Sequence, residues 1–362
     1  MASRSVHHGE TRDAARLLLA AARERFSVAA IDLLLPEQSR LTEWQRLTAS
    51  TLLGQLVRTI EDALRADLAG RFAAREALHA ALSSAHVAIA LPLLERANVL
   101  REFDLGNVLV RRVEEHRVYK ANSGLVERDL IVELVRDSDE DIAGEAMALL
   151  IARSRRFDRF QEPVMAQTEL PAEIQHRLVW MIAAALRQYV VQQHKLPAGI
   201  ADAAIAASAS TLIATYDEGE SLEARCTRLV RRLDQAGRLD SALLIRMLEE
   251  GVLPLFVAGV ALRCRLDYHA AWEVLSDQRG RGPALLLRSA ELEREDAAAI
   301  LFILNSRGRL FSGAEGDATE AQLDLYDGTE EQTAREILHL WQVDPGYRAA
   351  IARLSTRGRE AA

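Results

Sequence analysis

A short helical phrase occurs three times between Leu233 and Leu301. In each copy an apolar residue is followed six positions later by a leucine, then by an acidic residue, and finally by a closing leucine. The copies contain, in order, Leu233, Leu239, Asp240 and Leu248; Val260, Leu266, Asp267 and Leu275; and Leu286, Leu292, Glu293 and Leu301. A period of roughly 26 to 27 residues, the length of two short helices and two turns, is typical of stacked helical hairpins.

The composition agrees with a helical protein. Ala, Leu, Arg and Glu dominate, and aromatic residues make up only 5% of the chain. These residues favour helices over the β-branched and aromatic residues that strands prefer. The apolar fraction of 49% is sufficient for a substantial core. We therefore predict an all-α fold built as an array of stacked antiparallel helical hairpins, in the manner of an α-solenoid.

Turn and breaker residues divide this array into four segments. We predict an N-terminal helical array over 1–216, short helical-hairpin repeats over 222–308, a flexible loop over 309–328 and a helical pair over 329–362. Within the first segment Thr42 opens a long helix to Leu68, a helix restarts near Ala90, and another helix occupies 160–168. The boundary at 216–221 rests on a polar run that contains glycine.

With these residues in view, the chain resembles a bacterial family of helical, HEAT-like proteins that is catalogued as a domain of unknown function. The resemblance rests on Val87-Ala-Ile-Ala-Leu-Pro-Leu-Leu-Glu95 followed by Phe103-Asp-Leu105, on the hairpins from Leu229 to Leu304, and on Ala334, Trp341 and Tyr347. These are packing motifs. The resemblance implies a helical-repeat fold and brings no activity, cofactor or catalytic residue with it.

Cysteine use and hydropathy indicate the compartment. The two cysteines, Cys226 and Cys264, are too few for a disulfide framework, and neither belongs to a CxxC pair. No apolar run reaches the roughly 20 residues of a membrane span. We therefore expect a cytoplasmic protein that has two buried thiols and no membrane segment.

Two arginine clusters stand out in a chain whose net charge is −8. The first contains Arg153, Arg155, Arg156 and Arg159, interleaved with Phe157 and Phe160; the second contains Arg228, Arg231 and Arg232. Guanidinium groups offer forked donors for phosphates or acidic partners, although such clusters are more often solvated helix faces that pair with nearby acids. Because the whole chain is acidic, nucleic acid is not the partner that we expect.

Metal and cofactor motifs fit the sequence poorly. Asp137, Asp139 and Asp141 alternate as in a calcium loop, but the sixth position is Ile142 and the twelfth is Ala148, so an acidic helix start explains them better. Gly280-Arg-Gly282-Pro283 lacks the Lys-Ser/Thr of a phosphate loop and follows a helix, so it reads as a turn. We predict neither a cofactor nor a metal site.

Catalytic nucleophiles are equally hard to find. There is no GxSxG elbow, and Cys264 occupies a slot that holds Gly237 and Ala290 in the sister repeats, which indicates a small packing residue. His116 lies with Tyr119 and Lys120 before a glycine. A phosphorylatable histidine in a signalling protein is one reading of this group, and an exposed histidine in a linker is the ordinary one.

Repeats without a catalytic constellation favour a non-enzymatic interaction or regulatory scaffold that presents its helical surface to a protein partner. The recurring leucines specify packing, so we expect function in residues that differ between copies: Arg231, Arg232, Tyr268, His269, Arg279 and Arg281, together with the first arginine cluster. Two alternatives stay open, namely phosphate or nucleic-acid binding through the arginines and an enzyme with an unrecognised site. The partner and the oligomeric state are open as well.

Overall fold

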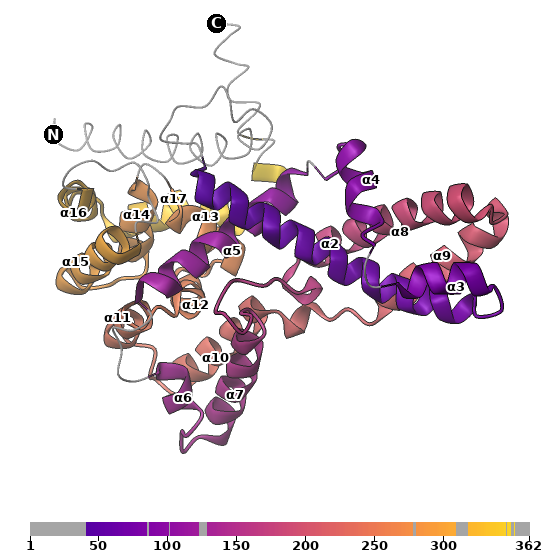
Figure 1. The fold of residues 1–362 in the computed structure, drawn as a ribbon. Coiled ribbons are helices and arrows are strands. Elements are labelled where there is room, and N and C mark those ends of the chain that lie inside the picture. Colours follow the sequence, from indigo (N-terminus) through magenta and orange to yellow (C-terminus); the bar gives the residue numbers. More distant parts are fainter. Residues whose placement is uncertain are drawn as a thin grey trace, which may run out of the picture. The chain divides into compact units, whose positions relative to one another are not determined.

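The computed structural model describes residues 41–84, 87–100, 102–122, 129–277, 280–308, 318–344, 346–348 and 351. Helices account for nearly all regular structure in these ranges (Figure 1). Among the described residues, strand-type pairing is limited to one isolated antiparallel bridge between Phe157 and Pro163. The predicted all-α fold is therefore confirmed.

The chain forms two compact units, and neither is continuous in sequence. Unit 2 consists of Thr42–Val113 and Ile151–Ala224, whereas unit 1 combines Glu114–Leu150 with the chain from Arg225 onward. The breaks fall inside three helices, α5 (Phe103–Asn122), α7 (Glu140–Ser154) and α10 (Leu222–Gln235). The expected boundary at 216–221 lies close to the break at Ala224, whereas no sequence pattern places 114–150 in the same unit as the repeats.

Unit 2 is organised around the long helix α2 (Glu43–Arg71). It begins with a capping box in which Gln45 N donates to Thr42 Oγ1 at 3.2 Å and Thr42 N donates to Gln45 Oε1 at 2.6 Å. Its buried face packs against the helices α3, α8 and α9. The other helical elements of the unit are α3 (Glu76–Ser83), α4 (Ala90–Arg96), η3 (Gln167–Glu169), α8 (Ala172–His194), α9 (Ala198–Ala214) and η4 (Glu218–Glu220).

A buried ion pair on α2 holds the connection between α3 and α4. Glu61 accepts hydrogen bonds from the backbone N–H groups of Ile89 and Ala90 at 2.9 and 3.0 Å. Arg65, 3.3 Å from Glu61, donates to the carbonyl oxygens of Leu82 and Val87, among others. The pair thus satisfies backbone groups where the chain is not helical, and α4 begins at Ala90, as predicted.

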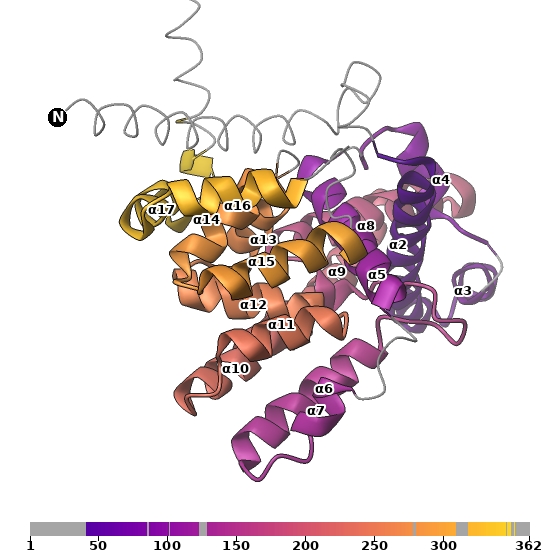
Figure 2. The same cartoon turned by 90° about the vertical axis from the view of Figure 1, so that its left-hand side faces the viewer.

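Unit 1 contains the three repeat copies as the helix pairs α10 and α11 (Ser241–Glu249), α12 (Leu253–Cys264) and α13 (Tyr268–Leu275), and α14 (Arg281–Ser289) and α15 (Arg294–Ile303). Figure 2 shows these helices one above another. Every apolar residue of the repeated phrase is buried. The remaining elements are α6 (Leu130–Leu134), η5 (Leu304–Gly308), α16 (Ala318–Gly328), α17 (Glu331–Leu338) and η6 (His339–Gln342).

The acid of the phrase starts the second helix of each copy. Asp240 accepts a hydrogen bond from Leu243 N at 2.8 Å, and Asp267 accepts one from Ala270 N at 2.7 Å. Glu293 occupies the same N-cap position without a side-chain cap bond. Short polar side chains reach the orphan N–H groups of the first turn, which explains the preference for aspartate in two copies.

The copies do not form a strictly linear stack. Helix α11 of the first copy packs against α15 of the third, in addition to α12 of the second. In a one-dimensional array each repeat contacts only its neighbours. The contact between the first and third copies makes unit 1 more closed than such an array.

Three local predictions differ from the structure. The loop predicted over 309–328 contains helix α16 from Ala318, because Tyr326 is buried and its hydroxyl donates to the carbonyl oxygen of Leu292. The helix predicted over 160–168 is a turn closed by the Phe157–Pro163 bridge, followed by η3. The linker predicted around His116 is part of helix α5. The predicted segments at 1–40, 309–317 and 352–362 lie outside the described residues.

Candidate functional site

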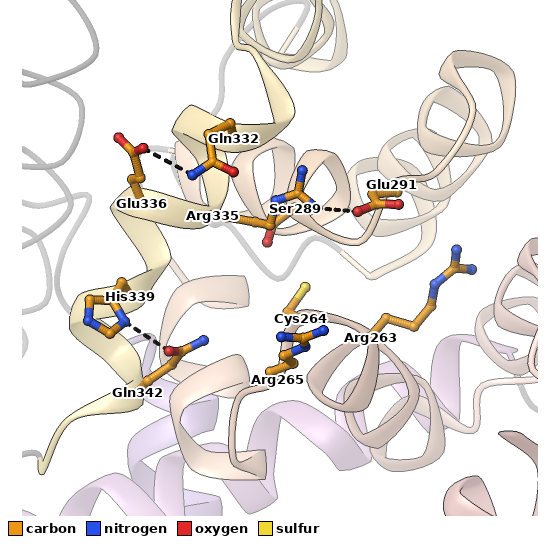
Figure 3. A pocket seen from close by; sticks show the side chains of 10 residues that line it. All are labelled: Arg263, Cys264, Arg265, Ser289, Glu291, Gln332, Arg335, Glu336, His339 and Gln342. Carbon is orange, nitrogen blue, oxygen red and sulfur yellow. Dashed lines mark hydrogen bonds and ion pairs between the residues drawn. The ribbon is translucent and has the colours of Figure 1, made fainter. Parts of the chain in front are cut away.

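A polar pocket of about 610 Å³ lies in unit 1, where α12 and α14 end beside α17 and η6 (Figure 3). Its volume is within the range of ligand pockets, but most such pockets are lined by apolar side chains. Here the lining is polar apart from one cysteine. The lining residues are Arg263, Cys264, Arg265, Ser289, Glu291, Gln332, Arg335, Glu336, His339 and Gln342.

The end of α12 supplies two arginines. Arg263 lies in the last turn, and Arg265 is the C-cap with φ of 56°, in the left-handed region that L side chains rarely adopt. In Figure 3 the side chain of Arg263 extends to the right, whereas those of Cys264 and Arg265 are drawn close together near the centre of the view. Within the described part of the chain, neither guanidinium forms an ion pair with a carboxylate. Among the described residues, the pocket therefore contains two cations that no acid pairs with.

The opposite wall is formed by side chains that bind one another. Arg335 of α17 pairs with Glu291, which follows α14. Gln332 Nε2 donates to Glu336 Oε1 at 3.1 Å, and His339 Nδ1 lies 2.9 Å from Gln342 Oε1. Dashed lines in Figure 3 mark these three contacts. These contacts fix the orientation of the side chains in this wall, and they give both Glu291 and Glu336 a partner within the wall.

Cys264 is a protonated thiol at neutral pH. Its Sγ lies 3.2 Å from the carbonyl oxygen of Leu286, to which it donates. Burial raises the pKa of the Cys264 thiol from 9.0 to about 12, and a hydrogen bond with Ser289 lowers the pKa by less. Because the thiolate is the nucleophile, this cysteine acts as a packing residue, consistent with the small residues at its slot in the other copies.

The first arginine cluster does not form one exposed surface. Arg155 is exposed, and Arg159 is exposed with its guanidinium 4.6 Å from the centre of the Phe160 ring. Arg153 is half-buried. Arg156 is only 4% exposed, and its Nε lies 2.8 Å from Glu169 Oε2, so its prediction as a surface residue is wrong. The sequence did not show that Arg156 would pair with Glu169, thirteen residues further along the chain.

The second cluster is also largely engaged within the molecule. Arg228 lies 3.3 Å from Glu145, and Arg232 lies 3.1 Å from Asp141. The two arginines belong to α10, and the two acids belong to α7. Arg231 is exposed. Two further pairs, Arg238 with Asp137 and Arg246 with Glu133, link the same parts of unit 1.

The other predicted interaction residues are divided between core and surface. Tyr268 is 7% exposed and its hydroxyl donates to Glu115 Oε1 at 3.3 Å, so it is a core residue and not a surface residue. His269 is exposed and meets the Tyr268 ring edge-on, with 6.0 Å between ring centres. Arg281 is half-buried at the start of α14. Arg279 lies outside the described residues.

Neither His116 nor the segment 280–283 forms an exposed functional site; both have roles in the fold. His116 is buried within α5 at 1% exposure, which contradicts an exposed phosphorylation site. At the glycine turn, Asp277 Oδ2 accepts hydrogen bonds from Arg281 N and Gly282 N at 3.0 and 3.2 Å. Gly280 has φ of 73° and starts α14. The turn predicted over 280–283 is thus the start of a helix: Gly280 is the N-cap, and the next three residues form the first turn of α14.

The three aspartates that resemble a calcium loop start helix α7. Asp139 Oδ1 accepts from Asp141 N at 2.9 Å and from Ile142 N at 3.3 Å, which is the arrangement of an N-cap. The pKa of Asp137 is lowered by the hydrogen bond from Asp139 N and by Arg238. In the ranges that the structure describes, no three His, Cys, Asp or Glu side chains gather as metal ligands would.

The pocket was not predicted, although its main signal is present in the sequence. Arg263 of the second copy corresponds to Ala236 in the first copy and Ser289 in the third, so it is a difference between repeats. Arg265, in contrast, corresponds to Arg238 in the first copy and to Glu291 in the third. Arg335 lies outside the repeats, so a comparison of the three copies could not have identified it.

The comparisons with known proteins identify a family. No curated protein and no solved structure matches the chain. None of the helices in the described residues combines the length and apolarity needed to cross a membrane. Residues 125–339, more than half of the chain, match the family described as "uncharacterised protein conserved in bacteria (DUF2336)". This match covers the three repeat copies and the pocket as far as His339, and the chain therefore belongs to this bacterial family of unknown function.

Proposed function

We propose that this chain is a non-enzymatic interaction protein of the cytoplasm, and that the pocket face of unit 1 binds a segment of a partner protein. The cytoplasmic location is supported by the two buried cysteines, which are both free thiols. The helical repeats supply a rigid framework for such a face, because each copy buries its leucines and leaves polar side chains outside.

One observation carries the proposal: the pocket is polar, and its groups are suited to hold a ligand and not to react with it. Its thiol is protonated at neutral pH, and guanidinium groups keep their proton at any pH that a protein experiences. Its two glutamates are engaged by Arg335 and Gln332. Hydrogen-bond donors with fixed directions favour recognition of a polar segment.

The arginine clusters favour this function over binding to nucleic acid. Nucleic-acid affinity depends on several cations that contact successive phosphates. Arg156, Arg228 and Arg232 are held by acids of the same chain. At the pocket, by contrast, Arg263 and Arg265 have no partner acid among the described residues, and both lie at the end of α12.

Site-specific photo-crosslinking tests the proposal. Gln332, an exposed residue of the pocket wall, is replaced by benzoylphenylalanine in the full chain, and the protein is irradiated in its native host cells. The matched control carries the same photoreactive residue at Glu95, which is exposed on α4 of unit 2.

A discrete protein adduct at position 332, and none at 95, is the expected result. Identical adducts at both positions would indicate unspecific contact and would refute the pocket face as the binding surface. Turnover of a metabolite by the purified chain, without any adduct at 332, would refute the non-enzymatic function itself.

A further inference from the structure

We infer that the pocket recognises carboxylate side chains, so that its partner segment is an acidic peptide bound by Arg263 and Arg265. This inference rests on the proposed function and specifies the chemistry of the ligand. It is carried by two observations on the pocket: the two arginines that have no partner acid among the described residues, and the orientation of the glutamine side chains.

The charges of the pocket favour an anionic ligand. Three arginines and two glutamates line it. Glu291 is bound by Arg335, and Glu336 accepts a hydrogen bond from Gln332, so the acids are directed to residues of their own wall. Within the described residues Arg263 and Arg265 have no carboxylate at ion-pair distance. The chain as a whole has a net charge of −8, which makes this local excess of cations a feature of the site and not of the surface in general.

The position of the arginines has to be weighed against the helix dipole. A cation in the last turn of α12 interacts favourably with the carbonyl end of the helix, and this accounts for Arg263 in part. Arg265 is the C-cap of the same helix, with φ of 56°, and the residue at the corresponding position of the third copy, Glu291, has φ of 55°. A left-handed C-cap is a common helix ending, so the case for Arg265 rests on its guanidinium, which has no carboxylate at ion-pair distance among the described residues.

The glutamines complement a peptide backbone. Gln332 uses its NH₂ group on Glu336, which leaves its carbonyl oxygen as an acceptor. Gln342 uses its carbonyl oxygen on His339, which leaves its NH₂ group as a donor. Counting contacts among the described residues, this leaves one acceptor and one donor, which match the N–H and C=O groups of a peptide unit. A free inorganic anion would use only the donors.

The polarity of the pocket is unsuited to the ligands that most pockets of this size bind. Drug-sized ligands and most cofactors bury apolar surface against aliphatic and aromatic walls. Cys264 is the one apolar residue among the lining side chains of the pocket. An acidic peptide, with carboxylates for the two guanidiniums and amides for the glutamines, uses the groups that are present.

Fluorescence anisotropy with a labelled oligoglutamate peptide tests the inference on the full chain. Oligoglutamine of the same length is the neutral probe, and inorganic phosphate is the competing anion. The variant is R263Q/R265Q. Its charge-matched control is R155Q/R231Q, which removes two exposed arginines outside the pocket. Thermal unfolding of both variants establishes that they remain folded.

We expect oligoglutamate to bind and oligoglutamine not to bind. R263Q/R265Q should weaken binding by about tenfold or more, because a charge-assisted hydrogen bond contributes on that order. The control should stay close to wild type, and R263K/R265K should restore binding only in part, because lysine keeps the charge but not the forked donors. Binding should also weaken as the salt concentration rises.

Equal losses in the two double variants would refute the pocket as the binding site, because they would reflect total charge alone. Displacement of the peptide by phosphate at equal concentration would identify a free-anion site and refute a peptide ligand. The proposed function is tested separately: if the photo-crosslink at position 332 persists in R263Q/R265Q, a partner binds this face and the acidic-peptide inference fails.

Discussion

In unit 2 the Nε of Arg156 lies 2.8 Å from Oε2 of Glu169, and both side chains are buried. Arg112 is buried beside them, with its Nε 3.8 Å from the same carboxylate oxygen and its NH2 group donating to the carbonyl oxygen of Arg156. One glutamate therefore lies within ion-pair distance of two buried arginines. Breaking such a group is costly because a buried charge loses its counter-ion.

Replacing Glu169 by glutamine should therefore destabilise the protein by about 3 kcal/mol. Urea unfolding followed by circular dichroism measures the loss as a lower transition midpoint. Glu95→Gln, which removes an exposed carboxylate of the same unit, should change the free energy of unfolding by less than about 0.5 kcal/mol. Equal midpoints for the two variants would contradict a structural role for the buried group.

Replacing Gly282 by alanine should lower the stability of the protein, and replacing Gly144 by alanine should raise it. A Cβ atom on Gly282 would overlap the carbonyl oxygen of Val274, a backbone atom that cannot move aside without distorting α13. Nothing lies within 4 Å of a Cβ on Gly144, which is in the interior of helix α7. We expect G282A to lower stability by about 1–3 kcal/mol or more and G144A to raise it by about 0.5–1 kcal/mol. Thermal unfolding of both variants distinguishes these signs, and a stabilised G282A would show that the close approach is absent.

The acidic residues of the repeated phrase should contribute different amounts to the free energy of unfolding. Asp240→Ala and Asp267→Ala each remove a side chain that caps a helix, at a cost of about 1 kcal/mol. Glu293→Ala removes no cap hydrogen bond and should cost only a few tenths of a kcal/mol through the helix dipole. Chemical unfolding of the three single variants makes the comparison within one protein. A loss at Glu293 as large as at the aspartates would contradict it.

Cys264 should resist thiol reagents in the folded protein at neutral pH. The pKa of its thiol is raised from 9.0 to about 12 by burial. Because the folded-state pKa is the higher one, the thiol's contribution to stability is fully present below pH 9 and is lost as the pH rises towards 12. Labelling rates in a Cys226→Ala background, with and without denaturant, measure the protection. Rapid labelling of the folded chain at neutral pH would contradict the assignment of Cys264 as a packing residue.

The salt bridges between α7 and α10 should be weak individually. Arg232 lies 3.1 Å from Asp141, and both side chains are largely exposed. Exposed pairs contribute about 0.2–1 kcal/mol and are screened by salt. A double-mutant cycle with R232Q and D141N should give a coupling energy in this range that disappears at high ionic strength. A larger coupling, unaffected by salt, would indicate a desolvated pair.

The local features of the fold could be predicted from the sequence because they depend on neighbouring residues. Thr42 begins α2, Ala90 begins α4, and the acids of the repeated phrase stand at helix starts. The starts at Thr42 and at the repeat acids depend on contacts two to four residues away, which periodicity and capping preferences reveal. The start of α4 could be predicted from its apolar run, although Glu61 of α2 also binds Ala90 N. The buried leucines of the repeats follow from the same periodicity.

Features that depend on distant residues could not be predicted. Arg232 and Asp141 are far apart in the chain, so a cluster that looked like a binding surface turned out to be engaged internally. Helix α16 was missed because Gln322 and Tyr326 find their partners on other elements of unit 1, the carbonyl oxygens of Gly280 and Leu292. The pocket combines the ends of α12 and α14 with α17, and no local pattern links these three elements.

The discontinuous course of unit 1 has a consequence for its biosynthesis. Helices α6 and α7 leave the ribosome early, whereas their ion partners on α10 and α11 follow much later; Glu133 precedes Arg246 by 113 residues. At bacterial translation rates this separation corresponds to a delay on the order of ten seconds. During that interval the apolar faces of α6 and α7, including Leu130, Ile131 and Ile142, have no finished unit to enter. The nascent chain therefore presents a hydrophobic hairpin to chaperones before the repeats that enclose it have been made.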